Sequence, residues 1–169
     1  MSEKETLKRI NNLSDTEAEE AFLRCCGSLV WAGQMAVYRP YATFKEMEER
    51  GESLWPKLTN SQWRQAFTHH PKIGDIDSLR TKFASTASWA GGEQSGTAQA
   101  SEKTLHALAH GNAAYENRFG YIFIVCATGK SADEMLALLT ERLTNDPETE
   151  IVIAAEEQKK ITRLRLRKL

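Results

Sequence analysis

The alternation of polar capping residues and apolar runs marks several helices in this 169-residue chain. At four places that we interpret as helix starts, a Ser or Thr is followed three residues later by a Glu or Gln, the spacing at which side chains and backbone amides cap a helix. These places are Ser14, Thr43, Thr59 and Ser131. The pattern predicts helices over residues 15–26, 44–50, 60–68 and 132–144.

Two longer helices follow from helical spacing of apolar residues. One begins at about Ser101 and reaches Phe119, where Gly120 can end it. Its buried face is predicted to hold Leu105, Leu108, Asn112 and Tyr115. The other opens at Asp146, with Pro147 in the first helical position. Its inward stripe is predicted to hold Ile151, Ala155, Ile161, Leu164 and Arg165.

One segment, residues 121–126 (YIFIVC), is β-branched and aromatic and reads as extended. A single strand cannot form a sheet, so we interpret it as a buried connector. No repeat, low-complexity tract or linker divides the chain. The prediction is an all-α fold, a single compact multi-helix domain over residues 1–169 with one extended connector near 121–126.

The stretch from Pro71 to Gln94 contains Gly74, Gly91 and Gly92 and lacks clear helical periodicity throughout. It is predicted to be a long loop. Long loops inside compact domains are usually functional, although a surface loop without function is the alternative.

Charge and hydropathy exclude several classes of partner. The 22 Lys and Arg nearly balance the 23 Asp and Glu, so no broad basic field is present to bind nucleic acid. The longest strongly apolar run, residues 121–127, is far shorter than the roughly 20 residues of a membrane helix. The first ten residues are polar, and residues 167–169 (RKL) only partly resemble a peroxisomal address. We therefore expect no membrane partner and a cytoplasmic location.

Metal and cofactor sites are not indicated. Cys25, Cys26 and Cys126 form no C-x-x-C pair and are expected to be buried, unreactive thiols. His106 and His110 have a spacing that can hold zinc, but nothing in the sequence brings them to His69 and His70. No phosphate-binding loop, dinucleotide fingerprint or nucleophile elbow occurs. We predict no metal and no cofactor.

His70 is the first candidate for chemistry. It directly precedes Pro71, so it should lie just past the end of the helix over residues 60–68. A helix C-terminus favours imidazolium, which would raise the pKa of this histidine and suit a general acid. The alternative is a histidine that only caps the last helix carbonyls.

Glu93 and Arg165 are the other candidates. Glu93 and Gln94 follow a glycine pair that would let a ligand approach, and they precede a short helical run whose dipole favours an ionised Glu; a solvated turn is the alternative. Arg165 is predicted to point inward and so to need an anionic or carbonyl partner, with a structural salt bridge as the alternative.

Four blocks in one order connect these residues. They are residues 70–75 (HPKIGD), 93–94 (EQ), 112–131 (NAAYENRFGYIFIVCATGKS) and 160–169 (KITRLRLRKL). This order is similar to that of the 2-oxo-4-hydroxy-4-carboxy-5-ureidoimidazoline (OHCU) decarboxylase family, and the resemblance covers about residues 10–169.

The resemblance implies an all-helical, cofactor-free and homodimeric carboxy-lyase of urate breakdown that converts OHCU to (S)-allantoin and CO2. By position, His70 and Glu93 match the catalytic residues. The positions matching substrate-binding residues are Pro71, Ala90, Gly91, Gly92, Gln94, Val125, Cys126, Ala127, Thr128, Gly129 and Arg165. Asn112 and Tyr115 also match, and we interpret them as packing residues.

One position departs from the family pattern. Where the family often has a serine three residues before the Glu, this chain has Ala90, so a hydroxyl contact is lost or comes from Ser88. This substitution is the only sequence feature that supports an alternative function, a helical interaction module that has kept the scaffold but lost catalysis.

Overall fold

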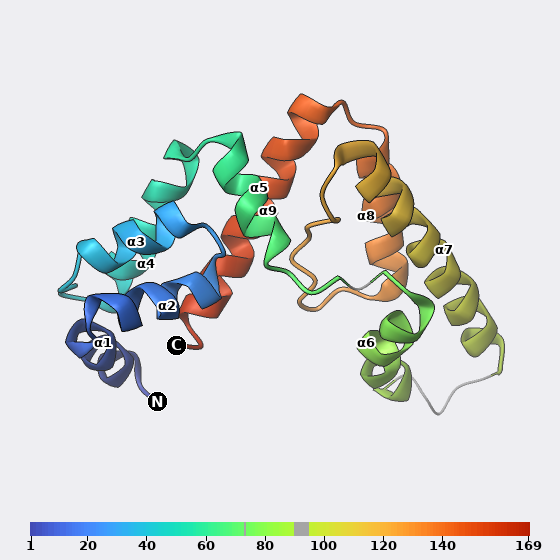
Figure 1. Cartoon of the computed structure of the whole chain (residues 1–169). Coiled ribbons are helices and arrows are strands. Elements are labelled where there is room, and N and C mark those ends of the chain that lie inside the picture. Colours follow the sequence, from blue (N-terminus) through green and yellow to red (C-terminus); the bar gives the residue numbers. More distant parts are fainter. Residues whose placement is uncertain (73, 90–94) are drawn as a thin grey trace. The chain divides into compact units, whose positions relative to one another are not determined.

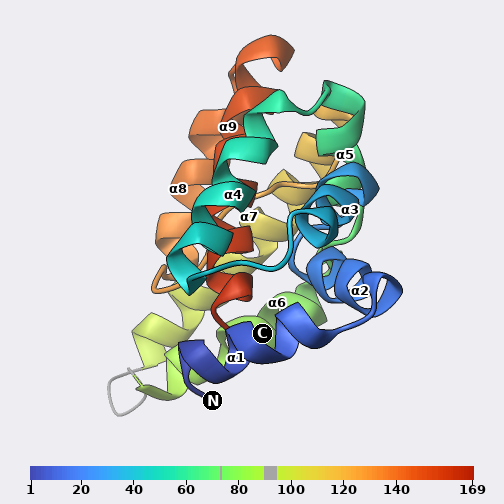
Figure 2. The same ribbon diagram turned by 90° about the vertical axis from the view of Figure 1, so that its left-hand side faces the viewer.

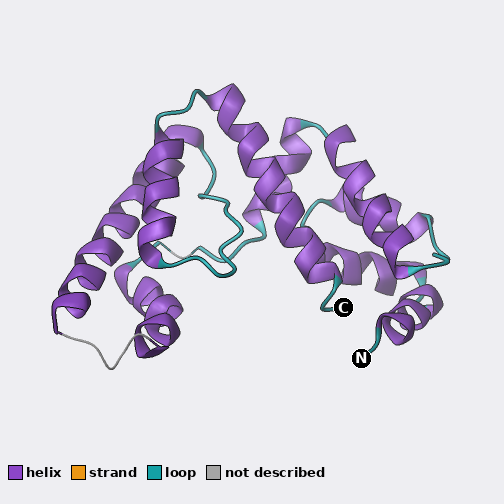
Figure 3. Cartoon of the chain, turned by 180° about the vertical axis from the view of Figure 1, so that it is seen from behind, coloured by secondary structure: helices purple, strands orange, loops and turns teal. Residues whose placement is uncertain are grey.

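A computed structural model describes residues 1–72, 74–89 and 95–169, and for residues 84–89 and 95–101 it describes the backbone alone. Across these residues the regular elements are helices, joined by loops and turns without a strand (Figures 1 and 3). The predicted all-α fold is confirmed. None of the helices in this described part has both the length and the apolar character needed to cross a lipid bilayer.

The four predicted capping residues start helices as expected. Ser14 and Thr59 form complete capping boxes, and the side chains of Thr43 and Ser131 accept a hydrogen bond from the backbone N–H three residues on. The resulting helices are α2 (Asp15–Cys25), α4 (Phe44–Leu54), α5 (Asn60–Thr68) and α8 (Ala132–Leu143). Helix α4 continues past the predicted end because its Gly51 packs against Trp31, whose indole N–H donates to the Gly51 carbonyl at 3.0 Å.

The predicted long loop over residues 71–94 is wrong for most of its length. Helix α6 (Ile76–Trp89) occupies it, and Asp75 caps its first turn by accepting the Ser78 N–H at 2.7 Å. Leu79 and Phe83, four residues apart, are both buried, which is the spacing of a helix with one buried face. The many Ser and Thr residues around them make this spacing hard to recognise in the sequence. Helix α7 (Ser95–Phe119) joins the short helical run predicted after Gln94 to the helix predicted from Ser101. Helices α1 (Glu3–Asn12) and α3 (Leu29–Val37) were not predicted.

Residues 1–70 and 153–169 form one compact unit. It contains α1 to α5, the short 3-10 helix η1 (Trp55–Lys57) and the second part of α9 (Pro147–Leu166). Helix α3 packs against both α2 and α4 (Figure 2). Large side chains of its core include Phe22, Trp31, Met35, Met47, Trp55, Phe67 and Leu166. The Trp55 indole N–H donates to the Ala155 carbonyl at 2.8 Å, which attaches α9 to η1.

Residues 71–152 form a second compact unit with α6, α7, α8 and the first turns of α9. Helices α7 and α8 lie side by side (Figure 1), and Gly111 permits this, since a Cβ there would lie 2.7 Å from Leu139. Gly120, with φ of 81°, ends α7 as predicted. In the extended connector that follows, Tyr121 and Ile124 are buried and the other residues are half-buried. That the whole chain is a single domain stays a prediction.

A buried ion pair holds this second unit together. The Glu150 carboxylate has no exposed surface and accepts hydrogen bonds from Arg142 Nε at 2.6 Å and from the Tyr115 hydroxyl at 2.5 Å. Asn145 donates to its second oxygen at 3.0 Å. Arg142 also donates to the Ile124 carbonyl at 2.6 Å, so the same pair fixes the extended connector. Burial and the Glu150 contact raise the pKa of the Tyr115 hydroxyl, which keeps it a donor.

Candidate active site

His70 lies where the sequence predicts, just past the end of α5. The N–H groups of His69 and His70 donate to the Ala66 and Phe67 carbonyls at 3.2 and 3.3 Å, which closes the last turn with backbone groups. The His70 side chain is therefore not needed as a cap, and its half-buried ring contacts α9 instead. The alternative of a capping histidine is wrong.

Two side chains of α9 hold the His70 ring. Nε2 is hydrogen-bonded to the Gln158 amide oxygen, and Nδ1 lies 3.3 Å from a terminal nitrogen of Arg165. A guanidinium can only donate, so Nδ1 must accept and Nε2 must carry the proton. This arrangement assigns His70 as a neutral imidazole with a lone pair at Nδ1.

The expected rise in the pKa of His70 is wrong. Burial lowers its pKa below the ordinary value of 6.5, and the Arg165 cation and His69 act in the same direction, while the hydrogen bond to Gln158 opposes them. The helix terminus is outweighed because removing the ring from water and placing a cation beside it both disfavour imidazolium. The structure thus favours a proton acceptor at neutral pH over a ready-made acid.

Arg165 lies beside the buried face of α9, half-buried as its predicted inward position implies. The residues that form that face are Ile151, Ala154, Ala155, Gln158, Thr162 and Leu166. Ile161 and Leu164, which were predicted to share it, are only half-buried, because two polar residues take the inward positions. Among the described residues no carboxylate forms an ion pair with Arg165, which argues against the salt-bridge alternative.

An open cavity of about 490 Å³ lies in front of Arg165. The residues that line it are Glu20, Leu23 and Arg24 of α2 together with His69 and Arg165. Its volume is in the range of small-molecule sites. Since Arg165 both lines the cavity and donates to Nδ1 of His70, a ligand that reaches this guanidinium comes close to the imidazole.

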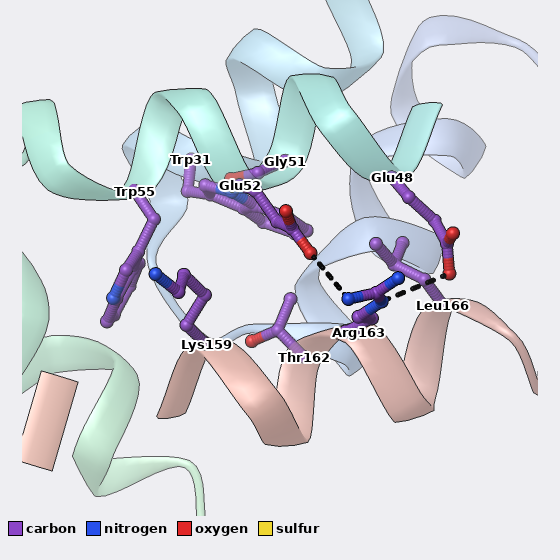
Figure 4. Close-up of a pocket in the computed structure, with 9 residues that line it drawn as sticks. All are labelled: Trp31, Glu48, Gly51, Glu52, Trp55, Lys159, Thr162, Arg163 and Leu166. Atoms are coloured by element: carbon purple, nitrogen blue, oxygen red, sulfur yellow. Dashed lines mark hydrogen bonds and ion pairs between the residues drawn. The ribbon is translucent and has the colours of Figure 1, made fainter. Parts of the chain in front are cut away.

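A second cavity, between α4 and α9, does not suit a substrate. It measures about 10 Å³, room for at most one water molecule. Figure 4 shows Arg163 reaching from α9 toward Glu48 and Glu52 of α4, at 3.9 and 3.4 Å. These ion pairs attach the end of α9 to α4, so the role of this cavity is structural.

Gly27 permits the close approach that places His69 and His70. A Cβ at this buried position would lie 2.2 Å from Cγ of His69, far inside contact distance. Only glycine lets the connection between α2 and α3 reach the end of α5 so closely. Nothing in the sequence pattern predicts this contact.

The other predicted substrate contacts before α7 lie on both sides of α6 in the sequence. Ala90, Gly91, Gly92, Glu93 and Gln94 lie outside the described residues. Pro71 is exposed and directly follows His70.

The segment Val125–Gly129 belongs to the second unit and includes a turn in which the Lys130 N–H donates to the Ala127 carbonyl at 3.0 Å. The Lys130 ammonium also donates to the Cys126 carbonyl at 2.8 Å, and Thr128 and Gly129 are exposed. Within the described residues the Val125 carbonyl accepts no hydrogen bond, which leaves it free for the predicted ligand contact. Cys126 is half-buried rather than buried as expected, while Cys25 and Cys26 are buried.

The histidine pair on α7 offers no metal site that the described residues support. His106 and His110 are both exposed, and His106 lies 3.9 Å from Glu102. In the described part of the chain no group of three or more His, Cys, Asp or Glu side chains converges.

Comparison with known proteins identifies a family. The model of the family described as OHCU decarboxylase matches residues 11–167. The "Uric acid degradation bifunctional protein TTL" of Arabidopsis thaliana is 38% identical over 154 residues, which cover 89% of this chain and 47% of the relative. The chain thus spans about half the length of that relative.

A second relative matches over nearly its whole length. The 2-oxo-4-hydroxy-4-carboxy-5-ureidoimidazoline decarboxylase of Amia calva is 32% identical over 171 residues, covering 95% of this chain and 91% of the relative. Among solved structures, a crystal structure of OHCU decarboxylase in the presence of (S)-allantoin superposes with a TM-score of 0.71 at 36% identity. It covers 89% of this chain and 96% of the other.

Proposed function

Since the chain belongs to the OHCU decarboxylase family, we propose that it is a carboxy-lyase of urate degradation that converts OHCU to (S)-allantoin and CO2. One observation carries the proposal at the level of residues. His70 and Arg165, 95 positions apart in the chain, are in contact beside a cavity large enough for this small substrate. We further propose that the enzyme is a homodimer, as the family resemblance implies, and that it acts in the cytoplasm.

The reaction needs little from the protein because OHCU carries its own electron sink. When the bond between C4 and the carboxylate breaks, CO2 leaves and its electron pair forms a C4=C5 double bond, while the electrons of the ring C5=N bond move to nitrogen, which takes a proton from water. The resulting enol loses its hydroxyl proton and gains one at C5, which gives the C4 carbonyl of allantoin. The protein must orient the breaking bond, stabilise moving charge and deliver the C5 proton to one face.

Neutral His70 suits the proton transfers. Its Nδ1 lone pair can accept the proton of the C4 hydroxyl and return it to C5, so one imidazole serves as base and then as acid. Arg165 would hold a carbonyl or anionic oxygen of the substrate in place of its present contact with Nδ1.

Three further roles rest on the family resemblance. Glu93 would bind ureido or ring N–H groups and disfavour the nearby substrate carboxylate. Gln94 would pair with the ring amide, and the Val125 carbonyl would accept a ring N–H.

The proposal is tested by forming OHCU in situ from urate with the two preceding enzymes and following optical activity. We expect rapid appearance of (S)-allantoin that depends on the added chain. Slow, racemic product equal to the reaction without the chain would contradict the proposal and favour the interaction module.

We expect Arg165→Met to raise KM about 10- to 100-fold, the usual cost of losing hydrogen bonds to a charged group, while kcat falls less. The reason is that the guanidinium contacts substrate oxygens without taking part in proton transfer. Steady-state kinetics at saturating and limiting OHCU measure the two effects separately.

Arg163→Met is the matched control for this prediction, since Arg163 lies on the same helix but is exposed and pairs with Glu48 and Glu52. It should leave KM unchanged. An Arg165→Met chain that is unfolded by circular dichroism, or that has wild-type KM, would remove Arg165 from substrate binding.

A further inference from the structure

Gln158 is hydrogen-bonded to the His70 ring and has no role in the proposed mechanism so far. It lies on α9 with no exposed surface, although a buried amide costs free energy unless its hydrogen bonds are satisfied. Its oxygen binds Nε2 of His70, and its nitrogen donates to the Thr162 hydroxyl at 3.1 Å, one turn further along the helix. Both ends of the amide therefore have partners.

Arg165, on the far side of the His70 ring, determines which end of the Gln158 amide faces the imidazole. With the amide reversed, its NH2 group would donate to Nε2, and the proton of neutral His70 would move to Nδ1. That proton would then point at the Arg165 guanidinium, so two donors would face each other. Arg165 thus selects the arrangement in which the Gln158 oxygen accepts from Nε2–H, and the Thr162 hydroxyl accepts from the amide nitrogen in that arrangement.

We propose that Gln158 is a positioning residue for decarboxylation: its buried amide holds the His70 ring with Nε2–H bound to the amide oxygen, so that the Nδ1 lone pair faces Arg165, which lines the cavity. The inference rests on the proposed function and on His70 as the proton carrier. Without this acceptor, Nε2–H would be buried unpaired and the ring could turn about its side-chain bonds, which would misdirect Nδ1.

The charged and titratable groups that face His70 make the proposal testable by pH. Among the described residues they are the Arg165 cation from α9 and the neighbouring His69, both of which lower the pKa of His70, while the Gln158 oxygen raises it. Removing the oxygen should therefore lower the pKa of His70, and replacing the amide by a carboxylate should raise it, because the negative charge favours imidazolium.

The experiment compares Gln158→Met, Gln158→Glu and Thr162→Val with the wild type and with Gln34→Met, a control at an exposed glutamine of α3. The pKa of His70 is measured by NMR titration of histidine-labelled protein, and kcat and KM on OHCU are measured across pH. For the wild type we expect the acidic limb of kcat below pH 6.5, because only neutral His70 can accept the substrate proton.

For Gln158→Met we expect kcat to fall at least about tenfold with little change in KM, since misplacing a reacting group by 1 Å can cost about 100-fold. The acidic limb and the pKa of His70 should move down in Gln158→Met and up in Gln158→Glu. Thr162→Val, which releases the far end of the amide, should lower kcat by a smaller factor. Gln34→Met should match the wild type.

The proposal is overturned if Gln158→Met keeps wild-type kcat, or if the pKa of His70 is the same in the Met and Glu variants. A purely structural role would lower the amount of folded protein without moving the two pKa values in opposite directions. A wild-type chain that is inactive on OHCU would instead refute the proposed function, whereas activity in the wild type with unchanged variants refutes the role of Gln158 alone.

Discussion

Replacing His70 by alanine should lower the turnover of OHCU about 10²- to 10⁴-fold, the range that general acid-base catalysis contributes. The reason is that the imidazole is neutral and held at both nitrogens, and in the proposed mechanism it would supply both the proton acceptor and the returning proton. The polarimetric assay measures the effect at saturating substrate, and the handedness of the product reports whether C5 is still protonated on one face.

His110→Ala is the control for this prediction, because it removes an exposed imidazole from α7. It should keep the wild-type rate, and both variants should keep the helical circular dichroism of the wild type. Full stereoselective turnover by His70→Ala would show that the proton travels by another group.

The second large effect concerns stability. Arg142→Met should lower the free energy of unfolding by about 3 to 5 kcal/mol, because it leaves the fully buried Glu150 carboxylate without its cation. The substitution also removes the donor to the Ile124 carbonyl and so loosens the extended connector. Urea titration followed by circular dichroism measures the change.

Arg80→Met provides the comparison, since Arg80 pairs with Glu102 on the surface, where water can replace the lost partner. It should change stability little. The double variant Arg142→Met/Glu150→Leu should recover part of the loss, because no buried charge is left unpaired. If Arg142→Met were as stable as Arg80→Met, the buried pair would not be holding the second unit together.

Local chemistry made four of the helix starts predictable. Ser14, Thr43, Thr59 and Ser131 each satisfy a free N–H at a helix start, and this needs only residues three apart. Helix α6 was not predicted because Leu79 and Phe83 are its only buried apolar residues among those described, and Ser and Thr surround them. The continuation of α4 through Gly51 depends on Trp31, which no local pattern could reveal.

The same contrast holds in the candidate site, where residues constrained by the local sequence were predicted and a residue placed by tertiary contacts was missed. His70 and Arg165 were found because a proline and a helical stripe constrain their positions. Gln158 was missed since a glutamine in a run of charged residues reads as solvent-exposed. The only signal was its place on the same helical face as Ala154 and Thr162.

The amino-acid order by itself determined the helical class, most helix starts, the family and the identity of the two residues now found in contact, because these depend on neighbours in the chain or on motif order. The tertiary structure alone decided that His70 is neutral and that Gln158 and Arg165 hold its two nitrogens. Protonation depends on burial and on charges brought close in space, and residues 88 and 95 positions away supply the partners.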